Sequence, residues 1–86
     1  MNFCGEIVVI DAGQMRAARG FLNWSQTELA EKAKISVQTV KRMESKGPES
    51  STIANVDAVM RALEAAGCSF LPDDGNGRGI RSKEVV

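Results

Sequence analysis

Apolar residues recur at spacings of three and four along most of the chain, a period that predicts amphipathic helices. Between residues 11 and 67 this pattern predicts about four helices. They are expected over residues 12–21, from the cap at Ser25 to a break at 34–36, over 37–45 and over 52–66. In the last of these, the residues expected to be buried are Ile53, Val56, Val59, Met60 and Leu63.

The two ends of the chain show a different pattern. Residues 3–10 finish with four consecutive β-branched side chains, which favour a strand over a helix. Residues 68–71 and 79–82 form two further extended segments, and the Pro, Asp, Gly and Asn residues at 72–77 between them are typical of a loop. We therefore expect a mostly α fold with short β-strands at both ends.

The middle of the chain carries two helix-start signals that lie 11 residues apart. Ser25 and Glu28 have the spacing of a capping box, in which each side chain bonds the backbone N–H of the other residue. Ser36 offers a second cap after the break at Lys34, and Asp11 offers one for the helix before both. Two helices joined by such a short break have the layout of a helix-turn-helix, in which the first helix supports the second against DNA.

The net charge of the chain is zero, but the charges are unevenly distributed. Residues 11–48 hold seven basic and four acidic side chains, a net charge of +3, and the remaining segments carry −3. A positive segment suits a nucleic-acid partner, although ordinary scatter of surface charges fits the same count. A chain of 86 residues is expected to form one small domain with little room for a deep catalytic pocket.

The composition argues against several other classes of protein. No apolar run approaches the ~20 residues of a membrane span, and the N-terminus lacks the pattern of a signal peptide, so we expect a cytoplasmic protein. Histidine is absent, and Cys4 and Cys68 are isolated, which fits neither a disulfide framework nor a metal site. We expect no catalytic residues and no cofactor, because the glycine-rich segment 75–79 does not join a strand to a helix as a phosphate-binding loop does.

The helix predicted at 37–45 has the side chains that a DNA-reading helix needs. Gln38 can bridge an adenine edge, Arg42 can bridge a guanine edge, and Val37 can pack on a thymine methyl group. Basic residues further along such a helix hold phosphates, and so do the free N–H groups at the start of the preceding helix. The candidate DNA-binding residues are Gln26, Thr27, Ser36, Val37, Gln38, Thr39, Lys41, Arg42 and Lys46.

Several of these candidates also have a purely structural interpretation. Ser25 and Ser36 serve first of all as helix caps. Thr39 either packs against the protein or reads bases. Lys41 and Arg42 also fit a solvated helix face.

A known family has the same residues at these positions. The chain resembles the phage-repressor and Cro-like (Xre-type) helix-turn-helix regulators over about residues 11–67. The shared residues are Arg19, Trp24–Gln26, Glu28–Ala30, Ile35–Ser36, Val40, Glu44 and Ala62–Leu63. The resemblance implies a lambda-repressor-like bundle of about four helices, here preceded by a strand or arm at 1–10 and followed by a hairpin-like appendage and tail at 68–86.

The resemblance also implies roles for individual residues. It implies that Gln26 contacts a backbone phosphate and that residues 36–39, with Arg42 one turn later, read bases. It further implies that Arg19 and Glu44 form an ion pair within the scaffold, although the two could also be unrelated surface charges.

Two features depart from the family pattern. Lys34 stands where the family usually has a glycine in a left-handed turn, so a lysine there is mildly strained. The usual fifth helix is missing, and the strands expected at both ends of the chain replace it. We expect these strands to form one small sheet and to support a dimer contact.

The combined expectation is a sequence-specific repressor that binds a pseudo-palindromic site in double-stranded DNA as a homodimer. A second interpretation is an antitoxin that binds a toxin partner and regulates its own operon, which a toxin-like reading frame beside this one would favour. A third is a protein-interaction module that has kept the fold and lost DNA binding. Zero net charge suits this third interpretation, whereas Gln38, Lys41 and Arg42 argue against it.

Overall fold

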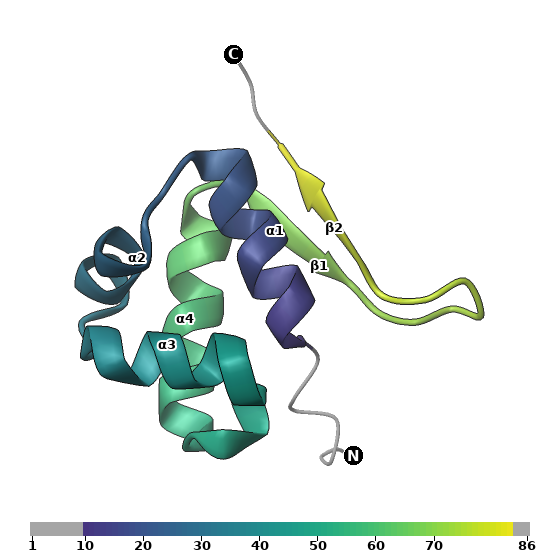
Figure 1. Cartoon of the computed structure of the whole chain (residues 1–86). Coiled ribbons are helices and arrows are strands. Elements are labelled where there is room, and N and C mark those ends of the chain that lie inside the picture. Colours follow the sequence, from purple (N-terminus) through teal and green to yellow (C-terminus); the bar gives the residue numbers. More distant parts are fainter. Residues whose placement is uncertain (1–9, 84–86) are drawn as a thin grey trace.

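The computed structural model describes residues 10–83, and within this range the chain folds into a small helical bundle with a β-hairpin (Figure 1). The helices are α1 (Ala12–Leu22), α2 (Gln26–Ala33), α3 (Val37–Lys46), the short 3₁₀ helix η2 (Pro48–Ser50) and α4 (Ile53–Ala65). The strands are β1 (Cys68–Leu71) and β2 (Gly79–Ser82). The predicted mostly α fold with four α-helices is confirmed, and η2 is an addition that the sequence pattern did not predict.

Each α-helix begins at a residue whose side chain accepts a hydrogen bond from the backbone three positions later. Asp11, Ser25, Ser36 and Thr52 fill this role, the first three as the sequence predicts. Such a cap typically stabilises a helix by about 1 kcal/mol, because it satisfies an N–H group that has no partner within the helix. The predicted helix boundaries are therefore correct to within one residue.

The turn after α1 follows one residue later than the expected end of the helix at 21, and a residue other than glycine makes it. Gly20 lies within the helix, as the expected range 12–21 implies. The chain turns at Asn23, which adopts the left-handed conformation (φ 59°, ψ 38°) and donates its N–H to carbonyls of the last helical turn. Asparagine tolerates this conformation better than most residues with a side chain, so no glycine is needed here.

One hydrophobic core holds the four helices and the hairpin together. Its buried apolar residues are Ile10, Met15, Ala18, Leu29, Ala30, Ala33, Val40, Met43, Val56, Val59, Leu63 and Cys68. Small alanines on α2 allow the neighbouring helices to approach closely, and α2 contacts both α3 and α4.

Two residues of the stripe predicted on α4 are not fully buried, although Met60 packs against the core. Ile53 is 61% exposed, so the prediction that it is buried is wrong, and Met60 is only half-buried. Both line an open groove of about 460 Å³ together with Ala54, Val56 and Asp57. Ile53 is the first residue of α4 and is exposed in this groove, whereas Val56, one turn further along, is buried in the core.

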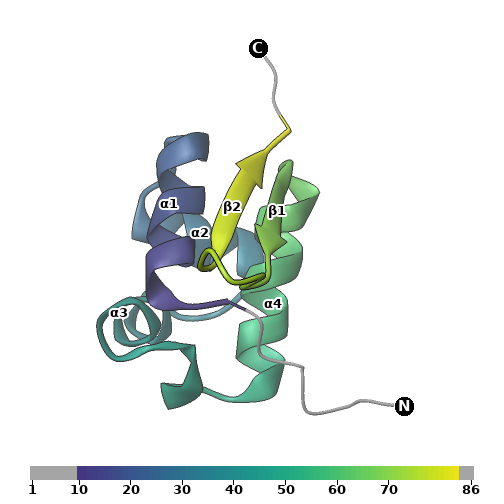
Figure 2. The same ribbon diagram turned by 90° about the vertical axis from the view of Figure 1, so that its right-hand side faces the viewer.

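The hairpin closes the core beside α1 and α4. β1 and β2 pair antiparallel, with Cys68 opposite Ser82 and Phe70 opposite Ile80. Opposite residues of an antiparallel pair share a face, so these four side chains face the bundle, where Cys68 is fully buried. Figure 2 shows β2 beside α1 and β1 beside α4, in agreement with their contacts.

The connecting loop at 72–78 is exposed and projects away from the helices (Figure 1). Asp73 organises it, because its carboxylate accepts hydrogen bonds of 2.9 Å from the N–H groups of both Gly75 and Gly77. These two bonds lower the pKa of Asp73 below its ordinary value. The loop predicted at 72–77 is confirmed.

The strand predicted at the N-terminus falls almost entirely on residues 3–9, which lie outside the described residues. Ile10 is described: it is buried in the core and is not in a strand. Within residues 10–83, the sheet consists of β1 and β2.

Candidate nucleic-acid interface

The turn between α2 and α3 brings the two helices into the arrangement that the sequence predicts. Lys34 adopts the left-handed conformation (φ 61°, ψ 42°), and the N–H of Ile35 donates to the carbonyl of Ala30 over 3.0 Å. This conformation costs a residue with a side chain about 1 kcal/mol relative to glycine. The left-handed conformation that the resemblance implies at Lys34 is therefore present.

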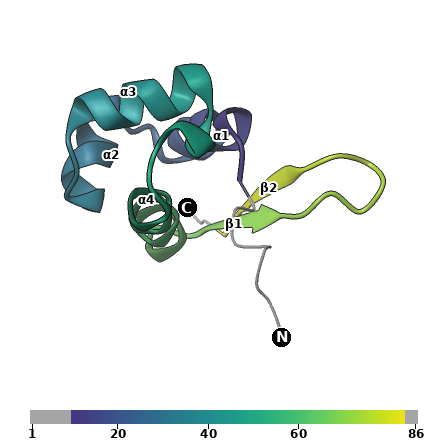
Figure 3. The same ribbon diagram turned by 90° about the horizontal axis from the view of Figure 1, so that it is seen from below.

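Helix α3 lies along one edge of the molecule, above α2 and α4 in the view of Figure 3. Val40, Met43 and Glu44 form its buried side. The side chains that it exposes include Gln38, Lys41, Arg42, Ser45 and Lys46. The predicted outward orientation of Gln38, Lys41 and Arg42 is therefore confirmed. α3 thus presents an amide and three cations to solvent along a helix of ten residues.

Val37, the candidate for packing on a thymine methyl group, is less accessible than Gln38, Lys41 and Arg42. It is half-buried and packs against the core. The reason is its place at the start of α3, close to the tight turn with α2. Only part of its side chain remains accessible for contact with another molecule.

The hydroxyl groups at the start of α3 are bonded to one another. Ser36 Oγ accepts the N–H of Thr39 over 3.1 Å, and the two hydroxyl oxygens lie 2.8 Å apart. Thr39 is half-buried, whereas Ser36 is exposed. The structure therefore shows Ser36 as a helix cap and Thr39 as partly packed against the protein.

The start of α2 lies next to α3. Ser25 and Glu28 form the predicted capping box, with hydrogen bonds of 3.0 and 2.7 Å. Thr27 is exposed, whereas Gln26 is half-buried. The amide nitrogen of Gln26 donates a hydrogen bond of 3.1 Å to Oε1 of Glu44 in α3. The sequence did not predict this contact.

The ion pair that the resemblance implies is present. Arg19 Nε and Nη2 donate to Oε2 and Oε1 of Glu44 over 2.7 and 2.8 Å, a bidentate arrangement. The Glu44 side chain is only 4% exposed. The hydrogen bond to Glu44 raises the pKa of Arg19 above its ordinary value, against the opposing effect of burial. Arg19 Nη1 also donates to the carbonyl of Trp24 over 3.0 Å, which ties the turn before α2 to the same pair.

One basic residue near this surface was not among the sequence candidates. Arg16 is exposed, and its Nη1 donates to the backbone carbonyl of Glu44 over 2.7 Å. This bond places the Arg16 guanidinium of α1 at the last turn of α3, where Glu44 is two residues before Lys46. Its place three residues before Arg19 is a signal that could have identified it, because residues three apart share a helix face.

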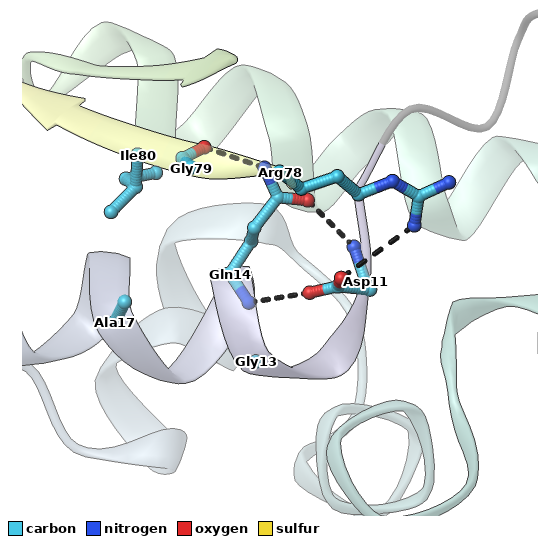
Figure 4. Close-up of a pocket in the computed structure, with 7 residues that line it drawn as sticks. All are labelled: Asp11, Gly13, Gln14, Ala17, Arg78, Gly79 and Ile80. Atoms are coloured by element: carbon cyan, nitrogen blue, oxygen red, sulfur yellow. Dashed lines mark hydrogen bonds and ion pairs between the residues drawn. The ribbon is translucent and has the colours of Figure 1, made fainter. Parts of the chain in front are cut away.

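A second polar site lies where the start of α1 meets β2, in a pocket of about 330 Å³ (Figure 4). The amide nitrogen of Gln14 donates to the carbonyl of Gly79 over 2.6 Å, and its oxygen accepts the N–H of Asp11 over 2.9 Å. Arg78 lies 3.6 Å from the Asp11 carboxylate. These contacts attach the hairpin to α1.

Comparison with known proteins agrees with this geometry. The helix-turn-helix family model matches residues 15–70, which is more than half of the chain. No curated protein matches the sequence. Among residues 10–83, no helix has the length and apolar character that crossing a membrane requires. The matched segment contains α2, the turn at Lys34 and α3 with its exposed cations, so the chain belongs to the phage-repressor and Cro-like (Xre-type) family of helix-turn-helix DNA-binding regulators.

Proposed function

We propose that this protein is a sequence-specific transcriptional repressor that acts in the cytoplasm by occupying DNA. The observation that carries the proposal is the exposed side of α3, where Gln38, Lys41 and Arg42 are accessible while Val40 and Met43 are buried. The major groove admits one α-helix, and only there do the base edges distinguish all four base pairs. In this proposal residues 11–67 form the DNA-binding domain, which carries α3 and the helices that support it.

The exposed side chains divide into those that read bases and those that hold phosphates. We assign base reading to Gln38, as a partner for adenine, and to Arg42, as a partner for guanine. Residues 36, 37 and 39 line the same end of α3, where the accessible part of Val37 suits a thymine methyl group. Phosphate contacts fall to Gln26, Thr27, Lys41 and Lys46.

Repression then needs a dimer, since one helix reads too few base pairs to select a site. Regulators of this kind bind half-sites one helical turn apart, about 34–36 Å, with two-fold symmetry. We propose that the β-hairpin supports this contact. Within the described residues β1 and β2 pair only with each other, so each strand has a second edge that a partner's strand can extend.

The test is a binding titration against duplex DNA from directly upstream of the gene, at two salt concentrations and with excess unrelated duplex. A double variant, Gln38→Ala with Arg42→Ala, is expected to lose specific binding by about 100-fold or more, because each good base contact is worth about 1–3 kcal/mol. The slope of log affinity against log salt counts the phosphates that Lys and Arg neutralise.

The matched control is Arg61→Ala. Arg61 is an exposed arginine whose side chain is 78% accessible and pairs with Asp57 on α4, away from α3. Its removal subtracts the same charge and is expected to leave specific binding unchanged. The same comparison is made with DNA that is selected from a random pool. If the wild type and the α3 variant bind both kinds of DNA weakly and equally, the proposal is contradicted and a protein-interaction module is favoured.

A further inference from the structure

The carboxylate of Glu44 receives hydrogen bonds from two other elements of the helix-turn-helix. Oε2 accepts from Nε of Arg19, and Oε1 accepts from both Nη2 of Arg19 and the amide nitrogen of Gln26. The donors come from α1 and from the first residue of α2, whereas Glu44 lies in the last turns of α3. One buried carboxylate therefore connects three helices.

This arrangement restricts Gln26. A glutamine at the first position of a helix usually samples several rotamers, and fixing such a side chain on binding costs about 0.5–1.5 kcal/mol. Here one amide N–H is already bonded to Glu44. The second amide N–H has no partner in the described residues, and the side chain is half-buried at the start of α2. Its terminal amide is thus oriented before any DNA arrives.

The charge of Glu44 also needs an explanation, because an acidic group near a phosphate contact opposes DNA binding. Arg19 neutralises it with two hydrogen bonds, and burial keeps the carboxylate away from solvent. Gln26 therefore donates to Oε1 of Glu44, an acceptor whose negative charge is balanced by Arg19. A buried carboxylate with this neighbour can hold the amide without repelling a phosphate.

We propose that Glu44 is a positioning residue for DNA binding, which holds the Gln26 amide so that its free N–H meets a backbone phosphate. The inference rests on the proposed function, in which Gln26 contacts a phosphate. It assigns Glu44 a role beyond its ion pair with Arg19. The ion pair stabilises the fold, and the third hydrogen bond prepares the contact.

A double-mutant cycle separates the two roles, with Glu44→Gln and Gln26→Ala measured alone and together. Glu44→Gln replaces one acceptor oxygen by an NH₂ group, so the three donor groups share a single uncharged oxygen. The charged Arg19 is the stronger donor, which weakens the bond from Gln26. The probe is a fluorescent duplex selected from a random pool by the wild-type protein. Each single variant is expected to weaken binding about tenfold, the typical effect of losing a hydrogen bond to a charged group. The double variant is expected to bind as weakly as Gln26→Ala alone, because the effect of Glu44 passes through Gln26.

Thermal unfolding of the same variants shows that they fold and reports the structural role. Arg19→Lys is the matched control, since it disturbs the ion pair and leaves the Glu44 oxygen for Gln26. Its effect on DNA affinity is expected to multiply with that of Gln26→Ala. The inference is overturned if the losses of DNA affinity from Glu44→Gln and Gln26→Ala multiply in the double variant. It is also overturned if the loss from Arg19→Lys depends on Gln26 in the same way as the loss from Glu44→Gln. Failure to select any duplex with the wild type would instead overturn the proposed function, and this inference with it.

Discussion

The side-chain amide of Gln14 in α1 donates a hydrogen bond of 2.6 Å to the carbonyl of Gly79 in β2, 65 positions later in the chain. Gln14 is only 5% exposed, and its oxygen accepts the N–H of Asp11 at the same time. One glutamine thus caps the first helix and anchors the hairpin. Because these partners are buried or half-buried, its loss leaves polar groups without water to replace the bonds.

Replacing Gln14 by Leu is therefore expected to lower the free energy of unfolding by about 1–3 kcal/mol, the cost of unsatisfied buried polar groups. Amide hydrogen exchange in β1 and β2 is expected to accelerate more than exchange in α3. Urea unfolding and exchange measured by NMR check both parts. Gln38→Leu, on the exposed side of α3, is the control and is expected to change stability little. Equal acceleration of exchange in α3 would show that Gln14 supports the whole fold and not the hairpin in particular.

The Arg19–Glu44 pair is expected to matter far more for stability than the pair on α4. Arg19→Ala leaves the Glu44 carboxylate buried without its main partner, at a cost of about 3–5 kcal/mol. Arg61→Ala removes an exposed pair with Asp57, which contributes about 0–1 kcal/mol. Urea unfolding followed by the fluorescence of Trp24 measures both. Similar losses for the two variants would contradict the structural importance of the buried pair.

Lys34 offers a site for stabilisation. Since it holds a left-handed conformation, Lys34→Gly is expected to raise the free energy of unfolding by about 1 kcal/mol. Lys34→Ala removes the same charge and keeps a Cβ, so it is the matched control and is expected to give no such gain. Thermal unfolding at low and high salt distinguishes the two. A gain for alanine equal to that for glycine would assign the effect to charge instead of backbone strain.

The hairpin loop is expected to weaken at acidic pH through Asp73. Its pKa is lowered in the folded protein, first by the N–H groups of Gly75 and Gly77, so its contribution is complete above the pKa of the unfolded chain. That contribution is lost as the pH falls through the folded-state pKa. An NMR titration of the Asp73 carboxyl, with the Gly75 and Gly77 amides as reporters, checks the direction. Asp73→Asn keeps an acceptor oxygen, so its loop is expected to lose this pH dependence. A folded-state pKa at or above the ordinary value would contradict the prediction.

The proposed role of the strands in dimerisation predicts a change of oligomeric state. A chain without residues 1–6 and 75–86 is expected to sediment as a monomer, because the hairpin edges are lost. Circular dichroism must show that its helices are retained. A truncated chain that remains helical and dimeric would place the dimer contact elsewhere.

Much of the helix-turn-helix could be predicted because its determinants are local. The caps at Ser25 and Ser36, the break at residues 34–36 and the exposed side of α3 each depend on residues within a few positions of one another. Periodicity and capping chemistry report such features directly. The pairing of Arg19 with Glu44 was different: it was implied by the resemblance to a family, since nothing in the spacing of two residues 25 positions apart requires their contact.

The helical period predicted the wrong burial for part of α4. Such a pattern identifies the apolar face of a helix but does not show how much of that face the neighbouring elements cover. Val56 and Leu63 meet the core, whereas Ile53 extends into an open groove. The spacing of Arg16 and Arg19 could mark Arg16 as a candidate. Its hydrogen bond to the Glu44 carbonyl and the hydrogen bond of the Gln26 amide to Glu44 could not be predicted, because both depend on where the last turns of α3 lie.

The amino-acid sequence by itself determined where the helices begin, where the chain turns between α2 and α3, and which side chains α3 exposes. These properties follow from hydrogen bonds and side-chain periods within a single element and its immediate flanks. Only the tertiary structure decided that Gln26 bonds to Glu44 and that Gln14 holds β2. Those contacts depend on the relative placement of elements distant in the chain, which is set by the packing of the whole core.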